Sequence, residues 1–288
     1  MIHLAAQSLL TPDALPLSAI CETLGLSRAT YYRQQAKAEV GDPDVELRDQ
    51  IQRLALQWPQ YGYRRLTAEL HRQGVNANHK RVLRLMREDN LLCLRKRRFF
   101  STTDSRHSLL VYPNLLPELT ITAINQLWVA DITYIRLLRE FIYLAVILDA
   151  YSRRCIGWAL APYLETALAL EALQMALANR EVTGELVHHS DRGVQYASTA
   201  YTDLLKEQGI RISMSRRGNP YDNAQAERFM RTLKYEEAYL FAYETMAEAR
   251  SRIQHFLEEV YNQQRLHSAL GYVPPTEFEQ QLGHSTDA

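Results

Sequence analysis

The spacing of apolar residues changes near residue 125 and divides the chain into two parts. Before this point apolar residues recur every three or four positions, which predicts helices at 45–57, 66–73 and 79–88. After it, apolar runs between short polar connections predict five strands, at 127–137, 141–149, 155–161, 186–190 and 211–214. Helical spacing returns between and after these strands, at 166–179, 198–208, 223–235 and from about 246.

The order of these elements predicts an α/β domain with a mixed five-stranded sheet and helices on both faces. An all-α region precedes it, and its first part, 17–33, resembles a helix-turn-helix in which Gly25 supplies the turn and Ser27 caps the second helix. Simple packing of a helical hairpin explains this pattern equally well. We therefore expect a helical, DNA-binding region at 1–98, a linker at 99–124 and the sheet domain at 125–288.

The composition of the 288 residues is that of a globular protein, with 47% hydrophobic and 23% charged residues. Cys21, Cys93 and Cys155 lie far apart and match no zinc pattern, and their scarcity favours a reducing compartment. No apolar run approaches the ~20 residues of a membrane span, and the N-terminus lacks the pattern of a signal peptide. We therefore expect a cytoplasmic protein without a membrane partner.

The net charge of zero conceals a basic segment, because residues 51–100 hold 12 Lys and Arg against 3 Asp and Glu. Lys80, Arg84 and Arg87 recur at helical spacing and predict one basic face. A second basic run follows this helix and contains Arg95, Arg97 and Arg98. Both groups suit contacts to the phosphates of DNA, although a solvated helix face and a charged linker explain them as well.

Three acidic residues stand at positions typical of a metal site. Asp131 lies in the first predicted strand, Asp191 follows the fourth after 59 intervening residues, and Glu227 lies in a helix after 35 more. Carboxylates at the edge of a packed sheet are unfavourable unless a cation neutralises them, and clustered carboxylates suit Mg²⁺ or Mn²⁺. Two such ions about 4 Å apart can activate a nucleophile at a phosphodiester. We expect all three residues to be metal ligands and catalytic.

The helix that carries Glu227 places Arg231 and Lys234 on the same face, at i+4 and i+7. A surface ion pair between Glu227 and Arg231 is the alternative for these two residues taken alone. Before the helix, either Asp222 or Asn223 is positioned to cap it, and Asp222 with Gln225 would form a box-like cap.

Five stretches of the sequence carry a resemblance to a known family. They are Trp128-Val129-Ala130-Asp131-Ile132-Thr133-Tyr134, His189-Ser190-Asp191-Arg192-Gly193-Val194-Gln195-Tyr196, the segment 215–227 with 232–236, the segment 261–276, and Tyr61-Gly62-Tyr63-Arg64-Arg65-Leu66. From about 17 to 280 the chain resembles the second-reading-frame product of the insertion sequence three family of bacterial transposases. These are retroviral-integrase-like recombinases with an Asp-Asp-Glu (DDE) triad.

The resemblance implies a ribonuclease H-like fold, two Mg²⁺ or Mn²⁺ ions on the three carboxylates, and a contact from Lys234 to DNA. The implied activity is strand cleavage at transposon ends, followed by strand transfer through transesterification. The implied partners are double-stranded DNA with terminal inverted repeats, target DNA, further copies of the chain on DNA and an upstream-frame product. The implied location is the bacterial nucleoid. A non-enzymatic DNA-binding repressor and a ribonuclease H-like nuclease are the alternatives.

Other residues have a structural explanation. We expect four aromatic residues to belong to the core of the sheet rather than to stack on bases, namely Trp128, Tyr134, Phe141 and Tyr143. His188 and His189 are not expected to bind oxygen-preferring ions. For Arg265 and His267, near the C-terminus, a contact to DNA and a role in docking the tail are equally open.

Overall fold

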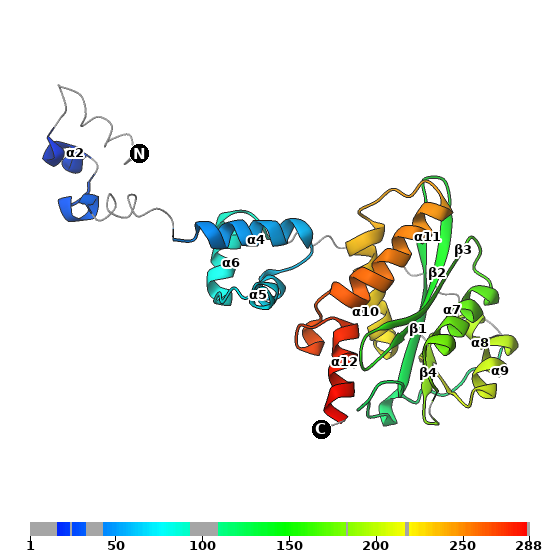
Figure 1. Cartoon of the computed structure of the whole chain (residues 1–288). Coiled ribbons are helices and arrows are strands. Elements are labelled where there is room, and N and C mark those ends of the chain that lie inside the picture. Colours follow the sequence, from blue (N-terminus) through cyan, green and yellow to red (C-terminus); the bar gives the residue numbers. More distant parts are fainter. Residues whose placement is uncertain are drawn as a thin grey trace. The chain divides into compact units, whose positions relative to one another are not determined.

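The computed structural model of the chain describes residues 16–23, 25–32, 43–92, 109–182, 184–216 and 219–286 (Figure 1). It contains two compact units, Met1–Leu92 and Cys93–Ala288. The predicted DNA contacts Arg95, Arg97 and Arg98, and residues 99–108 of the predicted linker, lie outside the described residues. Within the described ranges, no helix combines the length and the apolar character that a bilayer crossing requires.

The first described segment of unit 1 has the predicted turn between two short helices. Helix α2 (Leu17–Thr23) is followed by Gly25 with φ of 63°, a left-handed conformation that glycine adopts without strain. Ser27 then accepts a hydrogen bond from the backbone N–H of Thr30 at 3.1 Å, and a helical turn begins at Arg28. The predictions for Gly25 and Ser27 are therefore confirmed.

Three helices form the second described part of unit 1: α4 (Val45–Gln57), α5 (Tyr63–Arg72) and α6 (His79–Glu88). Their apolar faces meet in a core that includes Ile51, Leu66, Leu70, Leu85 and Met86. Asn78 caps α6, because its side chain accepts from the N–H of Lys80 at 2.8 Å. Helix α5 begins three residues earlier than predicted, because Gly62 is its extended N-cap.

Five strands form the mixed sheet of unit 2: β1 (Leu127–Arg136), β2 (Phe141–Asp149), β3 (Cys155–Ala161), β4 (Val187–Ser190) and β5 (Arg211–Met214). The strand order is β3-β2-β1-β4-β5. The first three strands are antiparallel, whereas β4 pairs in parallel with β1 and with β5. The ribonuclease H-like fold is thus confirmed, with β1 in the centre and β4 beside it.

Helices cover both faces of this sheet (Figure 1). The elements are α7 (Thr166–Asn179), α8 (Val194–Ala197), α9 (Thr199–Glu207), α10 (Ala224–Leu233), α11 (Met246–His255) and α12 (Pro275–Thr286), with the π-helical segments η3 (Lys234–Ala238) and η4 (Phe256–Gln264). On one face, Trp128 and Ala130 of β1 pack in a cluster with Leu173 of α7. On the other face, Val129 packs in a cluster with Phe229 of α10. Successive side chains of β1 point to opposite faces of the sheet, so α7 packs on one face and α10 packs on the other.

The C-terminal part is held to the sheet domain by ion pairs. Arg265 is 4% exposed and donates to both carboxylate oxygens of Glu236, at 2.6 and 2.8 Å. Glu279 of α12 accepts from Arg154 at 2.6 Å and from Arg180 at 2.5 Å. Of the two roles left open for Arg265, the structure shows the docking role.

Candidate active site

Asp131 stands where the pairing of β1 with β4 ends. The parallel register joins Leu127 to Val187 and continues to Val129, and Asp131 lies two residues further along β1. The residue is partly exposed, whereas its carboxylate is surrounded by protein, and its Oδ1 accepts a hydrogen bond from the N–H of Ile132 at 2.9 Å. The central strand therefore carries this carboxylate just beyond the end of its pairing with β4, while Asp131 still pairs with Val146 of β2.

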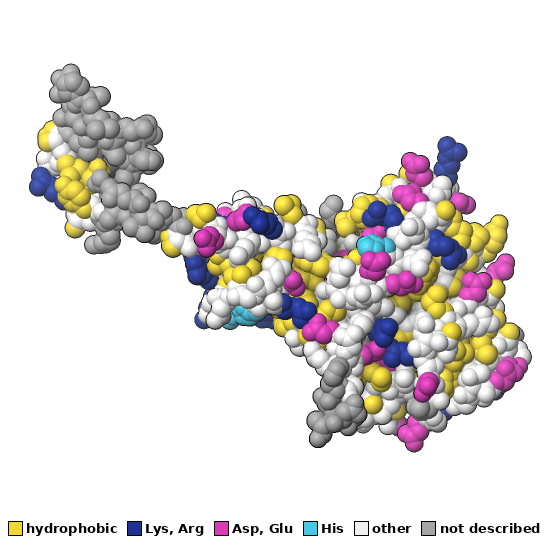
Figure 2. Space-filling model, in the orientation of Figure 1, with side chains coloured by type: hydrophobic (Ala, Val, Ile, Leu, Met, Phe, Trp, Pro, Cys, Tyr) yellow, Lys and Arg dark blue, Asp and Glu magenta, His cyan; other side chains and the backbone are white. Residues whose placement is uncertain are grey.

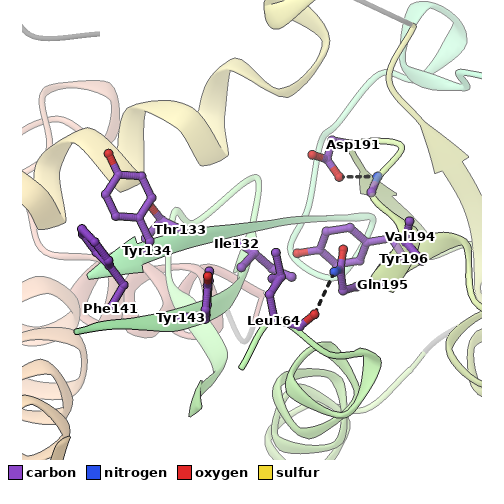
Figure 3. A pocket seen from close by; sticks show the side chains of 11 residues that line it. Ile132, Thr133, Tyr134, Phe141, Tyr143, Leu164, Asp191, Val194, Gln195 and Tyr196 are labelled. Atoms are coloured by element: carbon purple, nitrogen blue, oxygen red, sulfur yellow. Dashed lines mark hydrogen bonds between the residues drawn. The ribbon is translucent and has the colours of Figure 1, made fainter. Parts of the chain in front are cut away.

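Asp191 follows the last residue of β4 and is held by the turn that comes next. Its Oδ1 accepts from the backbone N–H of Gly193 at 2.9 Å (Figure 3). A Cβ atom at Gly193 would lie 3.0 Å from this same oxygen and 3.2 Å from Oε1 of Gln195. A side chain at this position would therefore press on the carboxylate, which would have to give way by a few tenths of an ångström.

The two histidines before Asp191 serve the fold. His189 is fully buried, with Nδ1 2.8 Å from Oγ of Ser213 and Nε2 3.0 Å from Oγ of Ser215. Nε2 of His188 lies 2.9 Å from the hydroxyl of Tyr201. Burial lowers the pKa of His188 to about 3 and that of His189 to about 4, so both rings are neutral at pH 7.

Glu227 lies in the first turn of α10, and Asn223 fixes the start of that helix. Asn223 donates from Nδ2 to the carbonyl oxygen of Ala130 at 3.0 Å, instead of capping its own helix. The predicted cap by Asp222 and Gln225 is wrong. The Asp222 carboxylate instead accepts from the backbone N–H of Arg216 at 2.8 Å and from its guanidinium at 3.0 and 3.1 Å.

Electrostatics connect the three carboxylates. Burial, and then the negative charge of Asp191, raise the pKa of Asp131 to about 8, and the charge of Glu227 adds to this effect. Loss of hydration also raises the pKa of Glu227. Burial is the larger cause, and the charges of Asp191 and Glu227 add to it because both act on Asp131.

The donor set fits hard divalent cations. All three side chains offer carboxylate oxygens, and a bound cation would remove the repulsion that disfavours the charged form of Asp131. In the described residues, no three His, Cys, Asp or Glu side chains gather closely enough to hold a single ion. The structure therefore does not bring the three carboxylates into one coordination sphere, although the charges of Asp191 and Glu227 both act on Asp131.

Two basic residues of the same helix have different surroundings. Lys234 begins η3, its Nζ lies 4.3 Å from the centre of the Tyr134 ring, and the charge of Asp131 attracts it. Burial lowers the pKa of Lys234. Arg231 is exposed, with its guanidinium 5.6 Å from the centre of the Tyr235 ring. Among the described ion pairs, none joins Arg231 to Glu227, so the surface-pair alternative is not observed.

A cavity of about 450 Å³ opens beside Asp191 (Figure 3). Its walls are Ile132, Thr133, Tyr134, Phe141, Tyr143, Leu164, Asp191, Gly193, Val194, Gln195 and Tyr196. The prediction of a core position is confirmed for Trp128, which is fully buried, and is wrong for Phe141, which is 51% exposed. Tyr134 and Tyr143 are half-buried and line the cavity. The apolar spacing of β2 predicts a strand but not the exposure of these rings, because it does not show which other elements cover the strand.

The basic face of α6 in unit 1 is partly neutralised. Arg84 donates to Asp44 at 2.6 Å and to Glu88 at 3.2 Å, whereas Lys80 and Arg87 are exposed. On the face of the molecule shown in Figure 2, basic and acidic side chains are interspersed in the same way. Arg84 therefore has a structural role beside any contact to DNA.

Models of known protein families match most of the chain. Models of the integrase core domain match residues 122–220 and 208–275, and a model of an HTH-like domain matches residues 42–99. Among solved structures, the catalytic core domain of BIV integrase aligns with 57% of this chain and 99% of its own, at 22% identity and a TM-score of 0.43.

Curated relatives match over nearly their whole length. The chain is 39% identical to the insertion element IS600 uncharacterized 31 kDa protein of Shigella sonnei, over 90% of this chain and 97% of that protein. It is 34% identical to the transposase InsF for insertion sequence IS3A of Escherichia coli K12, over 91% of this chain and 93% of that protein. At this identity and coverage, the chain belongs to the insertion sequence three family of transposases.

Proposed function

We propose that the chain is a DNA transposase in which Asp131, Asp191 and Glu227 form the catalytic centre. The observation that supports this proposal is the parallel pairing of β1 with β4, which ends just before Asp131 and Asp191, together with the hydrogen bond from Asn223, at the start of the Glu227 helix, to Ala130. Burial and the charges of Asp191 and Glu227 also raise the pKa of Asp131. Clusters of groups with strongly perturbed pKa values are typical of functional sites. The three residues come from β1, from the end of β4 and from α10, so a catalytic centre made of them would depend on the folded chain.

The same three residues would hold two Mg²⁺ or Mn²⁺ ions. When bound, such ions activate an attacking oxygen and neutralise the charge that develops on the leaving oxygen. Asp131 would serve as the shared ligand, because it interacts with both Asp191 and Glu227. The N–H groups of Ile132 and Gly193 each hold one oxygen of an aspartate and so fix the direction of the carboxylates.

The reaction consists of two displacements at phosphorus. In the first, the oxygen of water bonds to phosphorus at the transposon end, and the 3′-oxygen leaves and takes up a proton. In the second, this 3′-hydroxyl attacks a phosphodiester of target DNA and displaces another 3′-oxygen, so one phosphodiester replaces another. The chain positions the strands, and Lys234 beside Asp131 is suited to hold a phosphate next to the reacting one.

DNA binding extends over further basic residues in this proposal. Besides Lys234, the proposed contacts are Arg231, Lys80, Arg84, Arg87, Arg95, Arg97 and Arg98. We propose residues 1–98 as a DNA-binding region, 99–124 as a linker and 125–288 as the catalytic core, with several copies of the chain on terminal inverted repeats and with an upstream-frame product as a partner. The proposed location is the cytoplasm, in association with the nucleoid.

Strand cleavage by Asp191→Asn tests the proposal. The substrate is a duplex with the inverted repeats that flank the gene, in the presence of Mg²⁺ or Mn²⁺. The wild-type chain should cleave at the repeat end, and the variant should fold and bind DNA but not cleave. Full cleavage by the variant would refute the catalytic assignment. Cleavage that ignores the repeats would favour a ribonuclease H-like nuclease, and binding without any cleavage by the wild type would favour a repressor.

A further inference from the structure

The cavity beside Asp191 has walls of aromatic rings. Tyr134 of β1 and Tyr143 of β2 are opposite each other in the antiparallel register, so their side chains share one face of the sheet. Phe141 meets Tyr134 edge to face, with the ring centres 5.5 Å apart. Figure 3 shows these three rings along one side of the cavity and Tyr196 on the other.

The mouth of the cavity is apolar and exposed. Phe141 is 51% exposed, Val194 42% and Leu164 40%, and all three line the cavity. Contiguous exposed apolar side chains around a hollow indicate that a ligand covers them. The volume of about 450 Å³ lies in the range of sites that bind small molecules.

A buried polar atom in the cavity lacks a partner. Tyr196 is 3% exposed, and its hydroxyl makes no hydrogen bond within the described residues. An unsatisfied buried hydroxyl is unfavourable, so a water or a ligand group that reaches it would supply the missing partner. Gln195, on the same wall, donates from Nε2 to the carbonyl oxygen of Leu164 at 3.2 Å (Figure 3). The occupant is therefore planar and apolar on its faces and carries hydrogen-bonding groups on its edge.

The charges nearby indicate what is attached to this occupant. Asp191 lines the cavity, and Lys234 lies over the Tyr134 ring at 4.3 Å while it interacts with Asp131. A phosphate next to Lys234 would bring its nucleotide to the aromatic wall. The flat base of that nucleotide has the faces and the polar edge that the cavity requires.

We propose that this cavity receives an unstacked nucleobase of the DNA, from the nucleotide beside the phosphate at Asp131 and Asp191. Tyr134, Phe141 and Tyr143 provide the stacking surface, and the hydroxyl of Tyr196 donates a hydrogen bond to the edge of the base. The inference rests on the proposed function and adds to it a site that holds the strand in place during cleavage.

Photocrosslinking locates the base. The full chain with Glu227→Gln, a substitution outside the cavity, is bound to repeat-end duplexes with 5-iodouracil at single positions on either side of the cleavage site. A second set of duplexes carries 5-iodouracil in target DNA. Comparison of the two sets shows whether the base comes from the transposon end or from the target. Peptide mapping after irradiation should find the crosslink on Phe141, Tyr143 or Tyr134 for one or two adjacent positions. Crosslinks that map elsewhere at every position would overturn the inference.

A double-mutant cycle tests stacking at the mapped position. Removal of that base to leave an abasic site should weaken binding by the wild-type chain about fivefold or more, the lower end for one base–aromatic stack. Phe141→Ala should weaken binding to intact DNA similarly and should show no further loss on abasic DNA. Tyr239→Ala, which removes another exposed ring outside the cavity, should retain the full abasic effect. If Phe141→Ala and the abasic site each weaken DNA binding and their effects add, the ring does not stack on that base, and the proposal is contradicted.

Tyr196→Phe isolates the hydroxyl, because it keeps the buried ring. It should weaken binding of intact DNA by about two- to tenfold, the range for one neutral hydrogen bond, and leave abasic DNA unaffected. Wild-type cleavage without any crosslink in the cavity would overturn the base site and leave the transposase proposal intact. A crosslink in the cavity without cleavage by the wild type would do the opposite.

Discussion

Asn223 donates a hydrogen bond from its side-chain Nδ2 to the carbonyl oxygen of Ala130, at 3.0 Å and across 93 positions of sequence. Ala130 directly precedes Asp131, and Asn223 directly precedes the helix of Glu227. Asn223 is 6% exposed, so water does not compete for this bond. The bond therefore sets the distance between the strand of one carboxylate and the helix of another.

Replacement of Asn223 by Ala should separate positioning from stability. Loss of the bond should lower the free energy of unfolding by about 1–2 kcal/mol, because the carbonyl of Ala130 loses its partner. Strand cleavage should fall by about tenfold or more, because Glu227 is no longer held against β1. Single-turnover cleavage and chemical denaturation measure the two effects.

Asn179→Ala is the matched control. Asn179 also donates from Nδ2 to a backbone carbonyl, that of Ile156 at 3.1 Å, at the end of α7. Its substitution should lower stability by a similar amount and leave cleavage unchanged once the chain is folded. An equal loss of cleavage in both variants would mean that Asn223 acts on stability alone.

The titration of Asp131 predicts a pH-dependent stability in the absence of divalent ions. Its pKa is about 8 in the folded chain and near the ordinary value of 3.8 in the unfolded chain. Between these values the folded chain retains a proton that the unfolded chain has released, so stability falls as pH rises from about 4 to about 8 and then levels off. Denaturation in EDTA at a series of pH values measures this slope.

Asp131→Asn removes the titrating carboxyl group, so the fall in the free energy of unfolding between about pH 4 and pH 8 that is due to Asp131 should disappear. The variant should therefore gain stability relative to the wild type as pH rises toward 8. Added Mg²⁺ should stabilise the wild type more at pH 8 than at pH 6, because metal binding requires the ionised carboxylate, and should have little effect on the variant. Identical pH profiles for the two proteins would contradict the assigned pKa of Asp131.

Most of the fold could be predicted from the apolar spacing, because each element has its own period. The strands 141–149, 155–161 and 211–214 and the helix 166–179 have the predicted bounds. The side-by-side position of β1 and β4 came from the resemblance, since spacing alone does not give strand pairing. The positions of Asp131 and Asp191 at the end of that pairing follow from it.

Contacts between distant residues could not be predicted in this way. The spacing that assigns Phe141 to a strand is silent on whether another element covers its face, and here none of the described elements buries it. Asp222 fits a helix cap by local rules, but Arg216 provides a stronger, charged partner. Arg84 belongs to a basic stripe in sequence, yet Asp44, forty positions away, neutralises it.

The buried ion pair of Arg265 predicts a structural phenotype. Removal of the guanidinium leaves the Glu236 carboxylate without its bidentate partner, so Arg265→Ala should lower the free energy of unfolding by about 3 kcal/mol. Arg231→Ala, at an exposed site, should change it by less than about 0.5 kcal/mol. Denaturation of both variants provides the comparison. A folded Arg265→Ala chain of normal stability with weakened DNA binding would instead assign Arg265 to DNA.

The basic face of α6 predicts a difference in salt dependence. Lys80→Gln and Arg87→Gln should each lower the slope of log affinity against log salt concentration by about 1, the effect of one lost phosphate contact. Arg84→Gln should change the slope less and should reduce thermal stability, because Arg84 binds Asp44 and Glu88. Titrations of DNA at several salt concentrations test this. Equal slope changes for all three variants would show that Arg84 leaves its acidic partners when DNA binds.

Gly193 offers the most direct test of the Asp191 turn. In Gly193→Ala the new Cβ would lie 3.0 Å from Oδ1 of Asp191 and 3.2 Å from Oε1 of Gln195, so these side chains would have to give way by a few tenths of an ångström. A displaced ligand should reduce cleavage by about tenfold or more at saturating DNA, with a small change in stability. Gly184→Ala is the control, because a Cβ there meets no atom within 4 Å. Normal cleavage by Gly193→Ala in Mg²⁺ would show that the Asp191 carboxylate needs no fixed position. This result would contradict its proposed role as a metal ligand.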